Sequence, residues 1–95
     1  MEEWSYAQAK ASEKLARLHY FSVKKQQAGA EIEFVITVKE YATPDDPRMR
    51  FFALADKQTN QESAPYTPSG WGGTLLSALS DCIAEIHRFP YQGEV

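Results

Sequence analysis

The sequence has little cysteine, no long apolar run and no excess of positive charge. Cys82 is the only cysteine among 95 residues, which excludes an internal disulfide and a zinc site built from several thiols. No stretch approaches the roughly 18 apolar residues of a membrane span. The first residues, Met1-Glu2-Glu3-Trp4, lack the basic and apolar regions of a secretory signal. These absences predict a cytoplasmic protein with no membrane segment.

The overall charge argues against a protein that coats nucleic acid. The formal net charge is −3 and the pI is about 5.3, whereas affinity for nucleic acid comes largely from neutralising phosphates. Apolar residues make up 43% of the chain and charged residues 24%, which is ordinary for a globular protein. We therefore expect one domain over residues 1–95 with one core.

The first half of the chain predicts a helix followed by a hairpin. Residues 2–20 contain neither proline nor glycine and are rich in alanine, lysine and glutamate, which favours a helix over about 2–20. From Glu31 apolar residues alternate with polar ones, which is typical of a strand. The prolines and aspartates of 43–47 indicate a turn, so we expect an antiparallel hairpin over about 31–55. A short edge strand is expected over about 64–68.

The hairpin register predicts which residues form the core. Placing Val38 opposite Phe52 also places Glu40 opposite Arg50, so that opposite charges pair across the strands. The inner face would then consist of Ile32, Phe34, Ile36, Val38, Phe52 and Leu54. The second face would carry Val35, Thr37, Tyr41, Met49, Phe51 and Ala53. This second face is more apolar than a solvated sheet face needs to be, which suggests that a partner covers it.

The last regular element is a helix over about 74–88, followed by a tail over 89–95. Thr74 is a suitable N-cap, an apolar stripe that includes Cys82 follows it, and Pro90 ends the helix. The fold class is therefore α+β in the order α-β-β-β-α, with two helices packed on one face of a small antiparallel sheet.

The most unusual local feature is a tryptophan among glycines just before this helix. Gly70, Gly72 and Gly73 surround Trp71, and such a loop exposes backbone N–H groups that bind a phosphate or a carboxylate. The spacing matches neither the P-loop nor the dinucleotide-binding motif. The alternative is a tight turn from strand to helix in which Trp71 packs at the edge of the core.

No catalytic or metal-binding arrangement is found. His19 and His87 lie in no metal-ligand spacing, and Cys82 on an apolar stripe is expected to be a poor nucleophile. We predict no enzyme activity, no cofactor and no metal. The remaining basic, aromatic and glycine residues are candidate binding residues: Tyr41, Arg48, Arg50, Phe51, Tyr66, Trp71, Gly72, Gly73, His87, Arg88 and Tyr91.

Two resemblances follow from these elements. The expected order of helix, three strands and helix resembles the double-stranded-RNA-binding domain, which implies RNA binding through basic residues at the start of the final helix. Here residues 72–76 contain none, and Arg88 is the first basic residue that follows. The stretch 70–86 is similar to the strand-to-helix turn of HicB-type antitoxin domains, which implies binding to a toxin protein. The whole chain resembles small uncharacterised bacterial proteins, a resemblance that implies no activity.

Three functions stay open on the sequence. The favoured one is a non-catalytic domain that associates with itself or with a protein partner through the second sheet face or the aromatic tail. One alternative is a nucleic-acid-binding module, in which Arg48 and Arg50, with Lys24 and Lys25, meet phosphates while Trp71 or Tyr66 stacks a base. The other is a small-molecule site at the Trp71 loop.

Overall fold

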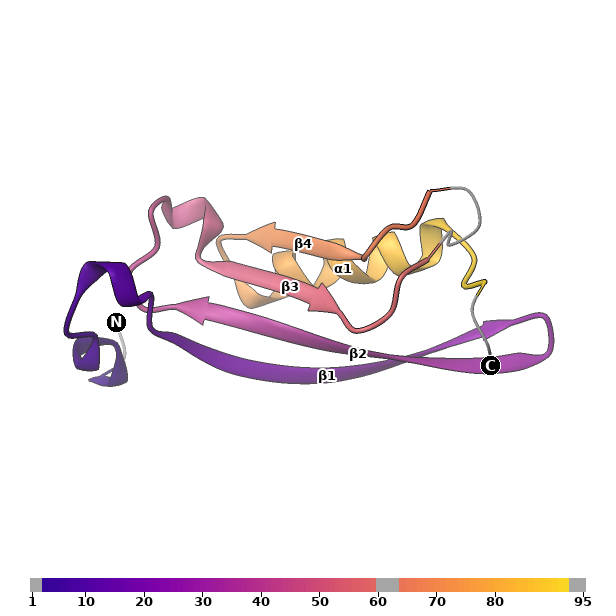
Figure 1. Cartoon of the computed structure of the whole chain (residues 1–95), viewed down its shortest axis with the longest axis horizontal. Coiled ribbons are helices and arrows are strands. Elements are labelled where there is room, and N and C mark those ends of the chain that lie inside the picture. Colours follow the sequence, from indigo (N-terminus) through magenta and orange to yellow (C-terminus); the bar gives the residue numbers. More distant parts are fainter. Residues whose placement is uncertain (1–2, 60–63, 93–95) are drawn as a thin grey trace.

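The computed structural model describes residues 3–59 and 64–92 and shows a four-stranded antiparallel sheet with one α-helix on one face (Figure 1). The strands follow one another in chain order across the sheet. They are β1 (Ala16–Gln27), β2 (Ala30–Tyr41), β3 (Phe51–Ala55) and β4 (Ser69–Gly72), and the helix is α1 (Leu75–Arg88). Three 3-10 turns complete the elements: η1 (Glu3–Ala7), η2 (Ala11–Glu13) and η3 (Pro47–Met49). The predicted α+β class and antiparallel sheet are confirmed.

The helix expected over residues 2–20 is not formed by the described residues. This segment contains η1 and η2, and then β1, which pairs with β2 along its whole length. The composition favours a helix, but backbone pairing with β2 and the packing of Phe21 and Val23 against the core override this local propensity. No described helix has the length and the apolar character that crossing a membrane requires.

A tight turn connects β1 directly to β2, so the two paired strands are also neighbours in the sequence. Ala28 and Gly29 connect Gln27 to Ala30, and both turn residues have positive φ, 51° and 78°. Two consecutive residues with positive φ give the turn whose twist matches that of a hairpin. The long hairpin of β1 and β2 extends well beyond the ends of β3 and β4 (Figure 1).

The pairing of β2 with β3 differs from the prediction by one residue. Val38 lies opposite Ala53 and Ile36 opposite Ala55, while Glu40 lies opposite Phe51. Because neighbouring residues of a strand point to opposite faces, this shift exchanges the two faces of β3. The buried core therefore contains Ala53 and Ala55 in place of the predicted Phe52 and Leu54, and its members are Ile32, Phe34, Ile36, Val38, Ala53, Ala55, Ala78, Cys82 and Ile86.

The observed register lets α1 approach the sheet closely. The small residues Ala53, Ala55 and Gly70 face the helix, and an added Cβ at Gly70 would lie 2.5 Å from the carbonyl oxygen of Ala78. A larger side chain in this row would hold the helix away from the sheet. β4 occupies residues 69–72, whereas the sequence predicts an edge strand over 64–68. In the predicted range, the described residues form only a bridge between Tyr66 and Thr59.

The two ends of α1 are fixed by side chains. Thr74 is the N-cap, as predicted, and forms a reciprocal capping box with Ser77. At the other end the Lys25 ammonium donates to the carbonyl oxygens of Ile86 and Phe89, at 2.9 and 2.8 Å. Burial lowers the pKa of Lys25. The β1–β2 hairpin is thereby attached to the helix that covers it.

The close contact at Gly70 gives a first prediction. Gly70→Ala places a methyl group against helix backbone, so it should reduce the free energy of unfolding by about 1 to 3 kcal/mol. Gly73→Ala is the matched control, because its nearest neighbour is 3.3 Å away and the cost should be clearly smaller. Urea denaturation followed by circular dichroism measures both, and equal losses would contradict the proposed packing.

Candidate functional site

One face of the sheet is covered by α1 and the other is open. Residues opposite one another on antiparallel strands share a face, so Leu18, Lys39, Phe52 and Trp71 form one row across the sheet. The next row contains Tyr20, Thr37, Leu54 and Ser69. These rows lie on the side opposite the buried core. The apolar side chains Leu18, Tyr20, Val35, Leu54 and Trp71 are 36% to 64% exposed.

Trp71 is the centre of an aromatic group on this open face. Its ring centroid lies 4.4 Å from that of Phe52 and 6.4 Å from that of Tyr41, with the Tyr41 ring nearly parallel. Aromatic pairs at these separations attract one another beyond simple burial. The group is therefore a fixed apolar surface supported by three strands. Together with its apolar neighbours it forms a surface that we call the aromatic patch: Leu18, Tyr20, Tyr41, Phe52, Leu54 and Trp71.

A pocket adjoins the aromatic patch at the end of β2. Its volume is about 230 Å³, and its walls are formed by Lys14, Tyr41, Thr43, Pro44, Asp45, Met49 and Trp71. The Lys14 ammonium and the Asp45 carboxylate form an exposed ion pair of 2.9 Å at this pocket. The pocket combines apolar walls with one charged pair.

Charge is distributed unevenly on the open face. Lys39 lies between Leu18 and Phe52 and is exposed, and its ammonium forms no ion pair or hydrogen bond with the described residues. The carboxylates of Glu31 and Glu33 lie on the same face, toward the hairpin turn. The aromatic patch thus surrounds the Lys39 ammonium, while Glu31 and Glu33 lie nearer the hairpin turn, where Lys24 pairs with Glu31 at 3.8 Å.

The glycines around Trp71 serve packing. Gly70 and Gly72 belong to β4 and face α1, where added side chains would collide with the helix. Trp71 points to the opposite side and is exposed on the open face, so the expected position at the core edge is wrong. Gly73 follows the strand, and an added Cβ there would lie 3.3 Å from the carbonyl oxygen of Pro47. The described contacts explain these glycines without a bound phosphate.

Three other candidate binding residues do not lie where the predicted register placed them: Arg48, Arg50 and Phe51. Arg48 lies in η3 and pairs with Asp46 at 2.8 Å. The expected pairing of Arg50 with Glu40 is wrong, because Glu40 lies opposite Phe51. The hydrogen bonds from Arg48 lower the pKa of Asp46 and raise that of Arg48. Glu40 instead contacts His19 at 2.9 Å. Arg50 bonds to Tyr41 through its backbone, and Phe51 packs against the core rather than on the second face.

The remaining candidates gather at the end of α1, away from the aromatic patch. Tyr66 contacts Phe89 edge to face at 6.2 Å, and the Arg88 guanidinium lies 5.3 Å from the Phe89 ring centre. His87 is exposed in the same last turn. Tyr91 packs against Phe34 at 6.0 Å, and its backbone exchanges two hydrogen bonds with the Gln27 side chain. The aromatic tail over 89–92 thus folds back onto the hairpin.

No catalytic chemistry is apparent at the cysteine. Cys82 is fully buried in the core, where its Sγ lies 3.5 Å from the Pro68 carbonyl oxygen. Burial raises the pKa of the Cys82 thiol to about 11. Within residues 3–59 and 64–92, no group of three or more His, Cys, Asp or Glu side chains could hold a metal ion.

The sequence prediction missed the residues that complete the aromatic patch. The sequence places Leu18 and Tyr20 in a helix and Phe52 and Leu54 in the core, and it does not include Lys39 among the candidate binding residues. The row of small residues Ala53, Ala55, Gly70 and Gly72 was the available signal, because glycine within a strand often marks a close backbone approach.

No protein-family model matches this chain, and neither the curated proteins nor the solved structures contain a match. Functional assignment therefore rests on the described geometry.

The buried thiol gives a prediction about pH. The pKa is 9.0 for an ordinary thiol and about 11 for folded Cys82, so between these values the folded chain keeps a proton that the unfolded chain loses. The free energy of unfolding should therefore fall as the pH rises through this window. Relative to Cys82→Ala, we expect the loss to be about 1 to 2 kcal/mol between about pH 8 and pH 10.5. A difference between the two proteins that does not change with pH would contradict burial of the thiol.

Proposed function

We propose that this chain is a non-catalytic interaction domain that binds another protein through the open face of its sheet. The aromatic patch carries this proposal. Its side chains come from all four strands, with Lys39 and Thr37 between the members on β1 and those on β3, and no described element packs on it. Exposed apolar surface of this kind, held on a rigid sheet, is typical of sites that bind proteins.

The positive charge of Lys39 indicates which chemical groups the partner protein must carry. An ammonium covered by an apolar surface loses water, which is costly unless an acidic group pairs with it. A second copy packed symmetrically on this patch would bring two Lys39 side chains together. A different protein, with apolar or aromatic side chains around a carboxylate, complements the patch better. The adjoining pocket has room for one side chain of that partner.

Nucleic acid is the second candidate. Bases stack on exposed aromatic rings, and Trp71, Phe52 and Tyr20 offer such rings. Glu31 and Glu33 lie on the same face, however, and would repel phosphates, although Lys24 pairs with Glu31. The resemblances to the double-stranded-RNA-binding domain and to HicB-type antitoxin domains stay predictions, as does a small-molecule role for the Trp71 pocket.

Photo-crosslinking from the patch tests the proposal. A benzoylphenylalanine in place of Leu54 should form an adduct with another protein in living cells. The same group in place of Leu76 should form none, because Leu76 is equally apolar and 74% exposed but lies on the helix. Lys39→Glu should reduce the adduct at position 54 by about tenfold, since the charge that meets the partner's carboxylate is reversed.

Three results would contradict the proposal. They are equal labelling from positions 54 and 76, an adduct that a nuclease removes, and an adduct whose mass is that of a second copy. Circular dichroism of Lys39→Glu checks that the fold is retained, since this exposed side chain makes no contact that the fold requires.

A further inference from the structure

The outer edge of β1 is long and unprotected. β1 is the first strand of the sheet, so only its inner edge pairs with β2. The two-residue turn makes Gln27 and Ala30 a hydrogen-bonded pair, and odd-numbered residues of β1 therefore bond to β2. The outward N–H and C=O groups belong to Leu18, Tyr20, Ser22, Lys24 and Gln26. No described residue bonds to these backbone groups.

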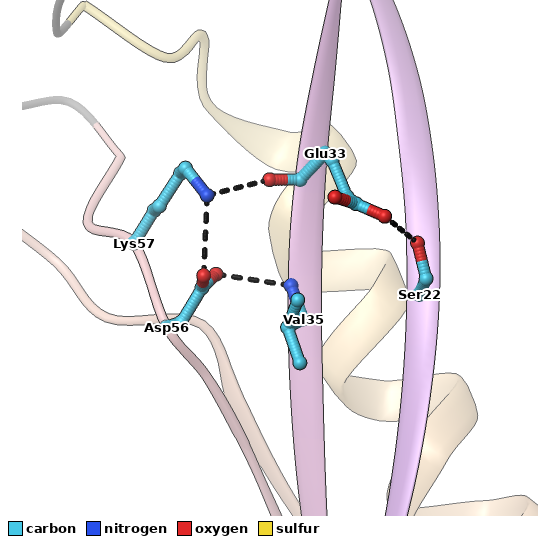
Figure 2. Close-up of polar contacts among 5 residues, drawn as sticks. All are labelled: Ser22, Glu33, Val35, Asp56 and Lys57. Carbon is cyan, nitrogen blue, oxygen red and sulfur yellow. Dashed lines mark hydrogen bonds and ion pairs between the residues drawn. The ribbon is translucent and has the colours of Figure 1, made fainter.

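The chain protects a second exposed stretch of strand edge, which belongs to β2. Beyond the end of β3, the edge of β2 that faces away from β1 pairs with no described strand. Figure 2 shows that side chains bond to the backbone of β2 along this stretch. The Asp56 carboxylate accepts from the Val35 N–H at 3.0 Å, and the Lys57 ammonium donates to the Glu33 carbonyl oxygen at 2.7 Å. Lys57 and Asp56 also pair with each other at 3.1 Å. Side chains placed in this way prevent another strand from pairing.

The contrast between the two edges points to a partner strand at β1. The free edge of β2 is short and already occupied, whereas that of β1 is longer, free of proline and glycine, and bare. We infer that β1 pairs antiparallel with β1 of a second copy about a two-fold axis, which joins two sheets edge to edge. A two-fold dimer brings the same surface from both copies together, so β1 must complement itself.

A register centred on Ser22 satisfies this condition. Ser22 then meets the partner's Ser22, Tyr20 meets the partner's Lys24, and Leu18 meets the partner's Gln26. All these residues direct their backbone groups outward, so the unpaired N–H and C=O groups find partners. On the covered face Phe21 meets the partner's Val23. Both are half-buried at the margin of the core, and the pairing would extend that core across the axis.

Charge favours the same register. Every charged residue of β1 is basic, namely Arg17, Lys24 and Lys25. Centring on Ser22 places Lys25 opposite the partner's His19, which contacts its own Glu40, and places Arg17 opposite the partner's Gln27. Centring on Phe21 instead places Arg17 opposite the partner's Lys25. Like charges directly opposite one another are destabilising, so the second register is disfavoured.

This interface goes beyond the proposed function. It uses the backbone edge of β1, whereas the partner protein binds side chains on the open face of the sheet, Leu18 and Tyr20 of β1 included. The dimer would place two open faces side by side in one continuous sheet. Failure of either proposal leaves the other intact.

Ser22→Pro tests the dimer. The Ser22 N–H points outward, so proline removes a hydrogen bond of the dimer and none to β2, and edge strands tolerate proline at such positions. Light scattering on a sizing column should show a dimer for the wild type and a monomer for Ser22→Pro. Ser22→Ala also loses the hydroxyl that donates to Glu33 but keeps the N–H, and it should remain a dimer. A monomeric wild type at about 100 µM, or a dimeric Ser22→Pro, would overturn the inference.

A second measurement tests the register even if Ser22→Pro fails to fold. In a Cys82→Ala background, Ser22→Cys should link to a second copy on mild oxidation, because position 22 meets itself at the axis. Gln26→Cys lies on the same strand and face but meets the partner's Leu18, so it should link far less. Equal linking, or linking at position 26 only, would refute pairing centred on Ser22.

Discussion

The structure depends on the close approach of one helix to two short strands. Four residues of β3 and β4 present almost no side chain to α1: Ala53, Ala55, Gly70 and Gly72. The helix residue at the point of contact is Ala78. This contact fixes the register between β2 and β3, because any shift by one residue would turn Phe52 and Leu54 toward the helix. The larger side chains of β2 and of α1 then fill the core on either side of the contact.

The same constraint produces the open face. Since the small residues of β3 and β4 face the helix, the alternating large residues must point the other way, onto the same face of the sheet as Tyr20 and Leu18 from β1. The aromatic patch is therefore a direct consequence of how the core is packed. Its stability as a surface follows from the helix, whose last turn is held by Lys25 and whose first turn is held by Thr74.

Local signals in the sequence predicted some elements well. The helix over 75–88 follows from the Thr74 cap, its apolar stripe and Pro90, and the alternation in β2 is strong enough to identify its buried face. β1 was missed because its covered face carries Lys25 and Gln27. These polar residues bond to the helix end and to the tail, which are contacts between segments far apart in the chain. Local propensity contains no information about such contacts.

The site was predicted in part for a related reason. Tyr41 and Trp71 were expected to contribute to binding, and the structure brings them together beside one pocket. Phe52 and Leu54 were placed in the core because large apolar residues usually go inside. In this fold, the helix packs closely on the sheet only because the residues that face it are small. This requirement is visible only in the tertiary contact between Gly70 and Ala78.

The register of β2 and β3 determines the open face, and nuclear Overhauser effects measure it directly. Val38 and Ala53 face one another between hydrogen-bonded pairs, where the two Cα atoms of an antiparallel ladder come closest, at about 4.5 Å. We predict a strong cross-peak between the Hα protons of Val38 and Ala53. A strong Hα cross-peak between Val38 and Phe52 in its place would move the aromatic side chains into the core and contradict the open aromatic face.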